Sequence, residues 1–236
     1  MPSWIRETGR GAVLGLLSVV LLGGGLGAQD QTSADTAAHV ARAMVMTFWT
    51  AGAQNQPVAT RYGYRYDRGL YLAGVQLRRV IAASDGESLT LAYAVDLLPV
   101  IMSSGMSDYK IVKAPCGTGH PSGCTFDSTV ALPPHTTYGF GVVPLGFLLR
   151  WQAGSMVGLQ LRASGGAAYF TSPVPDPLAS RFNFLADVGV LTDIRLTHRV
   201  ALVAGTRLHH ISNGKLAQVN PGMNSHMVEL GLSFTR

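Results

Sequence analysis

Charge is scarce in this chain of 236 residues. Only 13% of the residues are Asp, Glu, Lys or Arg, whereas soluble globular domains carry about 25%. Hydrophobic residues reach 47%, which excludes intrinsic disorder because so much apolar surface would stay exposed in an unfolded chain. The shortage of Glu and Lys excludes a charge-laced coiled coil. The length suits one domain or at most two.

Long apolar runs are also rare. Only residues 11–28 (GAVLGLLSVVLLGGGLGA) could form a helix through a bilayer, and they follow Arg6 and Arg10. A charged start, an apolar stretch and small residues ending at Ala28 are typical of a secretory signal peptide. We therefore predict a signal peptide at residues 1–28 and a single domain at residues 29–236. An uncleaved anchor helix is the alternative.

After residue 28 no apolar run reaches the roughly 18–20 residues that a spanning helix needs. A membrane protein without such helices must cross the bilayer as a closed β-barrel. Eight β-rich stretches follow, without a persistent helical period. We therefore predict an all-β fold, an eight-stranded antiparallel transmembrane β-barrel. Its expected strands lie near residues 41–51, 69–82, 88–101, 137–152, 156–170, 181–195, 200–211 and 224–235.

The connections between these stretches alternate in length. Three are tight, and four are longer and rich in Pro, Gly and Asn; the long ones lie near residues 52–68, 102–136, 171–180 and 212–223. Short periplasmic turns and longer extracellular loops are typical of barrels in the bacterial outer membrane. This pattern predicts an outer-membrane location. A soluble antiparallel β-protein is the alternative, but it does not need so few charges.

The two faces of the last strands differ in polarity. Leu202, Ala204, Thr206 and Leu208 share one face, which we expect to meet lipid. Arg207 and Glu229 fall on the other face of their strands and are candidates for an interior ion pair. Asp96, Gln160, Arg162 and Asp187 are further interior candidates, best interpreted as polar packing in a barrel too narrow for a channel.

The chain has two cysteines, Cys116 and Cys124, in its longest loop. An exported chain meets an oxidising compartment, which favours a disulfide between them. A metal site with His120 as third ligand is the alternative, although the spacing matches no common zinc pattern. Without residues 1–28 the chain has 16 basic and 12 acidic residues. A net charge of +4, scattered along the chain, does not indicate a nucleic-acid partner.

The segment with the clearest chemical content is residues 207–226 (RLHHISNGKLAQVNPGMNSH). His210 and Ser212 are two residues apart, so on a strand they point the same way. A His and a Ser on one face can act as the base and nucleophile of a serine hydrolase. The pair continues the lipid face of its strand to the level of the outer-leaflet headgroups.

His210-Ile-Ser212-Asn213, followed by Asn220-Pro-Gly-Met-Asn224-Ser, resembles the signature of the lipid A 3-O-deacylase (PagL) family. That family, also described broadly as acyloxyacyl hydrolases, consists of eight-stranded outer-membrane barrels that cleave an acyl ester of lipid A with a Ser-His-Glu triad. The resemblance is strongest over residues 182–236. It extends more loosely to YGFGVVPLGF and LYLAGVQLRRV earlier in the chain.

The resemblance implies a role for each matching residue. Ser212 would be the nucleophile and His210 the general base, while Asn213, Gly214 and Asn220 would stabilise the oxyanion or bind substrate. The third triad member falls at position 224, where this chain has Asn224 in place of Glu. An amide can hold the tautomer of the imidazole but supplies no negative charge to the imidazolium.

The implied substrate is lipid A or lipopolysaccharide in the outer leaflet, with membrane lipids around the barrel and no metal or cofactor. A non-enzymatic barrel of the same fold is the alternative, and whether the protein forms a homodimer stays open. His209 and His226 flank the site and are expected to be polar residues of the membrane interface. Five basic residues of the outer rim could bind lipid phosphates or anchor the barrel at the interface: Arg61, Arg65, Arg68, Arg181 and Lys215.

Overall fold

The structure is a computed structural model that describes residues 44–236, except 61–62, 107–108, 120–121, 132 and 221. The expected signal peptide at residues 1–28 lies outside the described residues. Among the residues that are described, no helix has the length and apolar character needed to cross a membrane.

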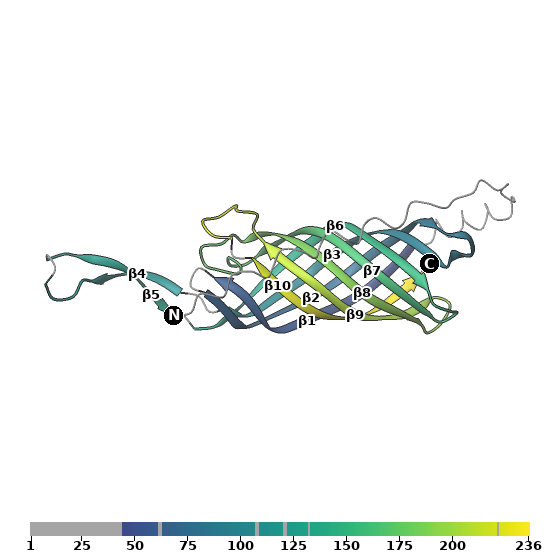
Figure 1. Ribbon diagram of the computed structural model, residues 1–236, viewed down its shortest axis with the longest axis horizontal. Coiled ribbons are helices and arrows are strands. Elements are labelled where there is room, and N and C mark those ends of the chain that lie inside the picture. The colour runs from purple at the N-terminus through teal and green to yellow at the C-terminus, as the bar shows by residue number, and fades with distance from the viewer. Residues whose placement is uncertain (1–43, 61–62, 107–108, 120–121, 132, 221) are drawn as a thin grey trace, which may run out of the picture.

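Eight antiparallel strands close into a barrel, because the first strand pairs with both the second and the last (Figure 1). The order around the barrel is β1-β10-β9-β8-β7-β6-β3-β2. The predicted fold class is therefore confirmed. The barrel strands are β1 (Met44–Thr60), β2 (Gly63–Ala83), β3 (Leu89–Met106), β6 (His135–Gln152), β7 (Val157–Phe170), β8 (Phe182–Arg195), β9 (Val200–Ser212) and β10 (Met223–Thr235).

The two ends of the barrel differ as the loop lengths predicted. Tight turns join β2 to β3 through a short 3-10 helix, η1 (Asp85–Glu87), and join β6 to β7 and β8 to β9. The C-terminus lies at the same end (Figure 1), which we call the inner end. The longer connections lie at the opposite end, which we call the outer end.

The prediction of a loop at residues 52–68 was wrong. β1 and β2 continue through it, and their pairing reaches Thr60 opposite Gly63. Pro57, Asn55 and the nearby Gly and Arg residues favoured a loop. Strands that extend past the bilayer need no apolar face, so their sequence loses the alternation that identifies a membrane strand.

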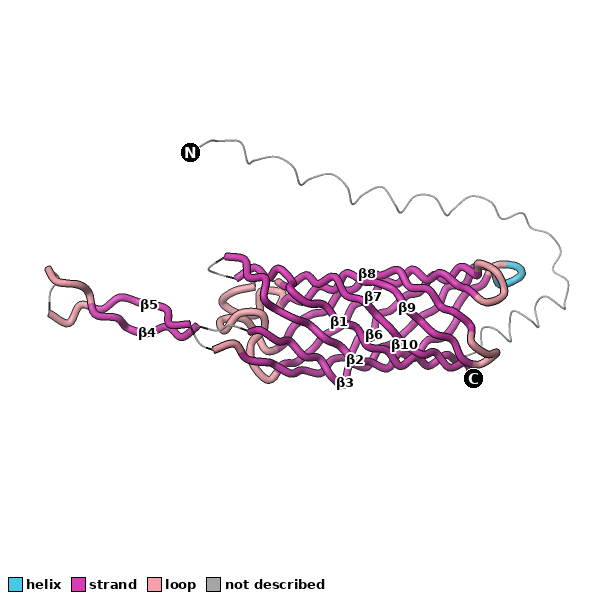
Figure 2. The backbone as a smooth tube through the Cα atoms, turned by 90° about the horizontal axis from the view of Figure 1, so that it is seen from below, coloured by secondary structure: helices cyan, strands magenta, loops and turns pink. Residues whose placement is uncertain are grey.

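The longest connection, residues 102–136, also contains strands that were not predicted. β4 (Tyr109–Pro115) and β5 (Thr125–Ala131) form a separate two-stranded sheet. This hairpin projects away from the outer end of the barrel (Figures 1 and 2). Cys116 and Cys124 are joined by a disulfide at its far end, with Cα atoms 5.4 Å apart. The disulfide is thus present, and the two cysteines are not available as metal ligands.

Removing this disulfide should affect the hairpin alone. An isolated two-stranded hairpin is only marginally stable, and closing so short a loop contributes about 2.5 kcal/mol. In a Cys116→Ser/Cys124→Ser double variant we expect faster proteolysis within residues 109–131, measured by limited digestion. The heat-modifiable gel mobility of the barrel should stay unchanged; its loss would contradict the separation of the hairpin from the barrel.

The outward face of the barrel is apolar and carries aromatic residues at two levels. One group, near the inner end, comprises Phe48, Tyr93, Phe147, Trp151 and Phe234. The other, near the outer end, comprises Tyr138, Phe140, Tyr169, Phe182 and Phe184. Two aromatic girdles around an apolar band mark the two interfaces of a membrane barrel. We call the second group the outer girdle.

The spacing along β10 fits the thickness of a bilayer. Phe234 belongs to the inner group, and Asn224 lies ten positions earlier on the same strand. Ten residues at about 3.3 Å each, tilted by about 40°, span about 25 Å, which is the height of the apolar band of such barrels. Asn224 therefore lies at the outer interface.

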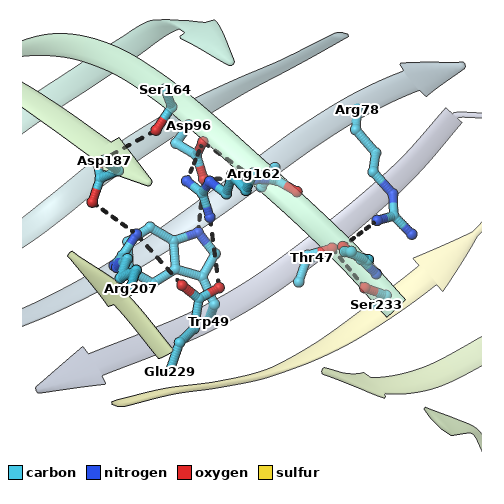
Figure 3. Close-up of polar contacts among 12 residues, drawn as sticks. Thr47, Trp49, Arg78, Asp96, Arg162, Ser164, Asp187, Arg207, Glu229 and Ser233 are labelled. Atoms are coloured by element: carbon cyan, nitrogen blue, oxygen red, sulfur yellow. Dashed lines mark hydrogen bonds and ion pairs between the residues drawn. The ribbon is translucent and has the colours of Figure 1, made fainter. Parts of the chain in front are cut away.

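The barrel interior is filled by charged side chains that neutralise one another (Figure 3). Arg162 lies 2.8 Å from Asp96 and 3.6 Å from Glu229. Arg207 lies 3.4 Å from Glu229, as the alternation of the strands predicted. The indole N–H of Trp49 donates to Asp96 over 2.8 Å. Because these groups pair and are nearly fully buried, they pack the interior and leave no channel at this level.

The connection between β7 and β8 packs into the outer end of the barrel. Val174 and Asp176 of this segment are buried, and the guanidinium of Arg68 donates to the carbonyl of Pro175. Arg68 is therefore an interior residue and not part of a phosphate-binding rim. The interpretation of Arg68 as a rim residue was wrong because it rested on the loop that proved to be strand.

Candidate active site

The candidate residues lie where β9 ends and β10 begins, at the outer end of the barrel. His210 is directly opposite Asn224 of β10 and opposite Ala186 of β8. Ser212 is opposite Phe184 of β8, a member of the outer girdle. His210 and Asn224 are exposed and Ser212 is half-buried. Register therefore places the three candidates on the lipid-facing side at the level of the headgroups.

A hydrogen bond fixes the imidazole of His210. Its Nδ1 lies 2.6 Å from Oδ1 of Asn224. An amide oxygen only accepts, so Nδ1 must carry the proton and donate it. In the neutral ring Nε2 is then left with its lone pair, which is the form that a general base needs. Asn224 thus fixes the orientation of the ring.

Ser212 completes the arrangement only in part. Within the described part of the chain, no hydrogen bond joins the hydroxyl of Ser212 to His210. Both side chains extend from the same side of β9, two positions apart. Nucleophile–base contacts are commonly long in the absence of substrate and shorten in the complex.

The loop after Ser212 is organised by Asn213. Its buried side chain donates to the carbonyl of Val219 over 2.7 Å and accepts from the N–H of Lys215 over 2.9 Å. Its own N–H donates to Oδ1 of Asn220 over 2.9 Å. Asn213 and Asn220 therefore hold the loop, and their mutual bond occupies the N–H of Asn213.

Gly214 is the next backbone donor after Ser212. Its φ is +60°, and an added Cβ would lie 2.8 Å from the ring of Phe184, so both conformation and space require glycine. Lys215 follows with φ +68°, and its N–H is already donated to Asn213. Among the three N–H groups after Ser212, only that of Gly214 has no partner within the described residues.

Gly222 forms the far wall of the site, and the sequence did not single it out. It has φ +65°, and a Cβ there would lie 3.3 Å from Cε1 of His210. Any side chain at this position would press on the edge of the imidazole that carries Nε2. Register and a positive φ identify this role, and neither can be read from the residue type alone.

A shallow groove of about 420 Å³ runs along the outward face below the site. It crosses β8, β9 and β10, and its outward lining is mainly apolar: Val188, Val190, Leu208 and Val228, with Thr206 and His226. The groove lies on the membrane-centre side of His210, because Leu208 and Thr206, which line it, precede His210 on the same face of β9.

His209 differs from its predicted place at the membrane interface. It is buried inside the barrel, where its Nδ1 lies 2.6 Å from the carboxylate of Asp187. Strand alternation requires this, because His210 faces outward and its neighbour must face inward. Ser225, which pairs with His209 in register, is buried as well. These residues face the packed interior and belong to the barrel core.

The remaining basic candidates at the outer rim are Arg181 and Lys215, both exposed. The side chains of Arg61 and Arg65 lie outside the described residues. Within the part of the chain that is described, no group of three or more His, Cys, Asp or Glu residues is placed to hold a metal ion.

Comparisons with known proteins give one family. The model of the family described as "Lipid A 3-O-deacylase (PagL)" matches residues 121–233, which include every candidate of the site. The resemblance predicted from the sequence is therefore confirmed over that range. No curated protein matches the chain.

Three solved structures are similar to the chain at low identity. The outer membrane enzyme PagL is 16% identical with a TM-score of 0.47, covering 78% of this chain and 97% of its own. Neisserial surface protein A (NspA) is 13% identical with a TM-score of 0.43, covering 81% and 96%. Ail, the attachment invasion locus protein of Yersinia pestis, is 10% identical with a TM-score of 0.39, covering 82% and 97%.

Proposed function

We propose, on the premise that residues 121–233 match the lipid A 3-O-deacylase family, that this barrel is a serine esterase of the bacterial outer membrane. Its substrate is a lipid A-like glycolipid of the outer leaflet, and the bond that it cleaves is an acyl ester. Ser212 is the nucleophile and His210 the general base.

The observation that carries this proposal is the orientation of His210. The bond from Nδ1 to Asn224 leaves Nε2 as the basic nitrogen, on the lipid-facing surface, beside Ser212 and at the level of the outer girdle. The ester bonds of an outer-leaflet lipid lie close to this level. A buried structural histidine would instead face the core, as His209 does.

The reaction follows from these positions. The hydroxyl oxygen of Ser212 attacks the ester carbonyl while Nε2 of His210 takes its proton. The oxyanion that forms accepts a hydrogen bond from the N–H of Gly214. The tetrahedral intermediate collapses to an acyl-serine, and His210 returns the proton to the departing sugar hydroxyl. Water, deprotonated by His210, then hydrolyses the acyl-serine and releases the fatty acid.

The groove along β8, β9 and β10 supports an acyl chain as part of the substrate. Its apolar residues run from the site toward the membrane centre, which is the direction that a chain takes from its ester. Ala186, opposite His210, is small and exposed, so the approach from β8 is open. These features favour a lipid ester over a soluble one.

Asn224 sets the expected speed of this enzyme. In a serine protease triad, replacing the acid by its amide lowers kcat about 10⁴-fold, and removing the serine costs about 2 × 10⁶. A site that already has the amide should therefore lose only about 10² on loss of its serine. The native enzyme is slow but measurable.

The test is fatty-acid release from purified lipid A by the barrel in detergent. Ser212→Ala should lower the rate about 10²-fold. Ser225→Ala, one strand away but facing the interior, is the matched control and should keep the native rate. Equal rates for native protein and Ser212→Ala, both with heat-modifiable mobility, would refute the proposal.

A non-enzymatic barrel is the second candidate. Two observations favour it: an amide in place of the acid, and the missing Ser212–His210 hydrogen bond within the described residues. In that case neither native protein nor any variant of Ser212 changes lipid A. The same experiment therefore separates the two functions.

A further inference from the structure

The inner end of the barrel, opposite the candidate active site, opens into a cavity of about 470 Å³. Two arginines that point into the barrel, Arg78 of β2 and Arg150 of β6, line it. Hydroxyl groups of Thr90 and Thr235 line it as well. The three tight turns and the last residues of β10 form its rim.

The carboxylate nearest these two arginines, that of Asp193, is bound by Arg150. Arg150 donates to both oxygens of Asp193, over 2.8 and 2.7 Å. Gln160 donates to the same Asp193 over 2.7 Å. The carboxylate is therefore bound on both oxygens, and its charge is neutralised by Arg150.

Arg78 is left with a neutral partner. One of its N–H groups donates to the amide oxygen of Gln160 over 3.2 Å. Its other guanidinium N–H groups have no hydrogen-bond partner among the residues described. Arg78 is half-buried, and Figure 3 shows it apart from the central cluster of Arg162, Arg207 and Glu229. Its charge is thus not neutralised by a carboxylate of that cluster.

The rim adds to this excess of positive charge. Arg195 and Arg199 line the cavity, and Glu87 is the one further acid that does so. Within the described lining there are four arginines against two carboxylates. A half-enclosed cavity with surplus guanidinium charge concentrates small anions.

We propose that this cavity binds a phosphate group, with the guanidinium of Arg78 as the principal ligand. A planar guanidinium offers two parallel N–H groups that match two oxygens of a phosphate, and the threonine hydroxyls can donate to the others. The cavity has room for a phosphate or a small phosphate ester. The group could come from a soluble phosphate of the periplasm or from the headgroup of an inner-leaflet phospholipid.

Isothermal titration of the folded barrel in nonionic detergent tests this site. One arm uses inorganic phosphate and the other uses short-chain dihexanoyl phosphatidylglycerol. Arg78→Gln should weaken binding about tenfold, as expected for the loss of one charge-assisted contact. Arg78→Lys keeps the charge but loses the two parallel N–H donors of the guanidinium. Its affinity should fall between that of Arg78→Gln and that of the native protein.

Arg79→Gln is the matched control. Arg79 is the next residue of β2, is exposed, and does not line the cavity, so the same charge is lost outside the site. Tenfold weakening by Arg78→Gln in the phosphate arm supports a soluble ligand, and in the lipid arm alone it supports a headgroup. Absence of binding in both arms, or equal weakening by Arg79→Gln, would overturn the proposal. Ser212→Ala should bind phosphate as the native protein does. The test of the phosphate site is therefore independent of the proposed esterase activity.

Discussion

Replacing Asn224 by Glu should raise the rate of ester hydrolysis by up to about 10⁴-fold, the factor that separates an acid from its amide in a serine triad. Asn224 already accepts the Nδ1 proton of His210 over 2.6 Å, so a carboxylate there meets an imidazole that is already oriented. It adds the negative charge that stabilises the imidazolium as Ser212 loses its proton. The measurement is kcat/KM for fatty-acid release from lipid A.

Asn224→Gln is the matched control, because it has the length of Glu without the charge. It should leave the rate at or below the native value. An increase of the same size with Gln would mean that the length of the side chain at position 224, and not its charge, limits the rate. A Glu variant no faster than the native protein would show that the triad is not what makes the native site slow.

Removing the carboxylate of Glu229 should destabilise the barrel by about 3–5 kcal/mol. Glu229 lies 3.4 Å from Arg207 and 3.6 Å from Arg162, and all three side chains are nearly fully buried. Glu229→Ala leaves two buried guanidinium groups with one fewer counter-charge. Urea unfolding of the barrel in lipid vesicles, followed by tryptophan fluorescence, measures the free energy of unfolding.

Glu87→Ala provides the comparison for Glu229→Ala. Glu87 is a partly exposed acid on the tight turn between β2 and β3, outside the interior network, so its loss should change the free energy of unfolding by less than about 1 kcal/mol. Equal effects of the two substitutions would contradict a structural role for the interior network.

The fold could be predicted because a barrel in a bilayer obeys one simple alternation. Every other residue of a spanning strand must be apolar, and a chain of low charge has few polar residues to place on the remaining face. Arg207 and Glu229 were assigned to the interior on that basis, and they meet there. The same parity placed His210 and Asn224 on the outside, where they lie opposite each other on adjacent strands.

Where the chain leaves the bilayer, that alternation no longer applies. β1 and β2 continue beyond the membrane through residues that suggest a loop, and β4 and β5 form a hairpin inside the longest connection. Neither extension is required by burial, so the sequence contains no apolar period to predict it. Gly222 was missed for a related reason: its role depends on a neighbouring strand and on a positive φ.

Lipid A extracted from a Gram-negative host is the most direct measurement of the central claim, that Ser212 cleaves an acyl ester in the outer leaflet. Mass spectrometry should detect a small fraction of lipid A lacking one hydroxyacyl chain in cells with the native protein, a much larger fraction with Asn224→Glu, and none with Ser212→Ala. Lipid A of unchanged mass in all three strains, each with a folded barrel in its outer membrane, would contradict it.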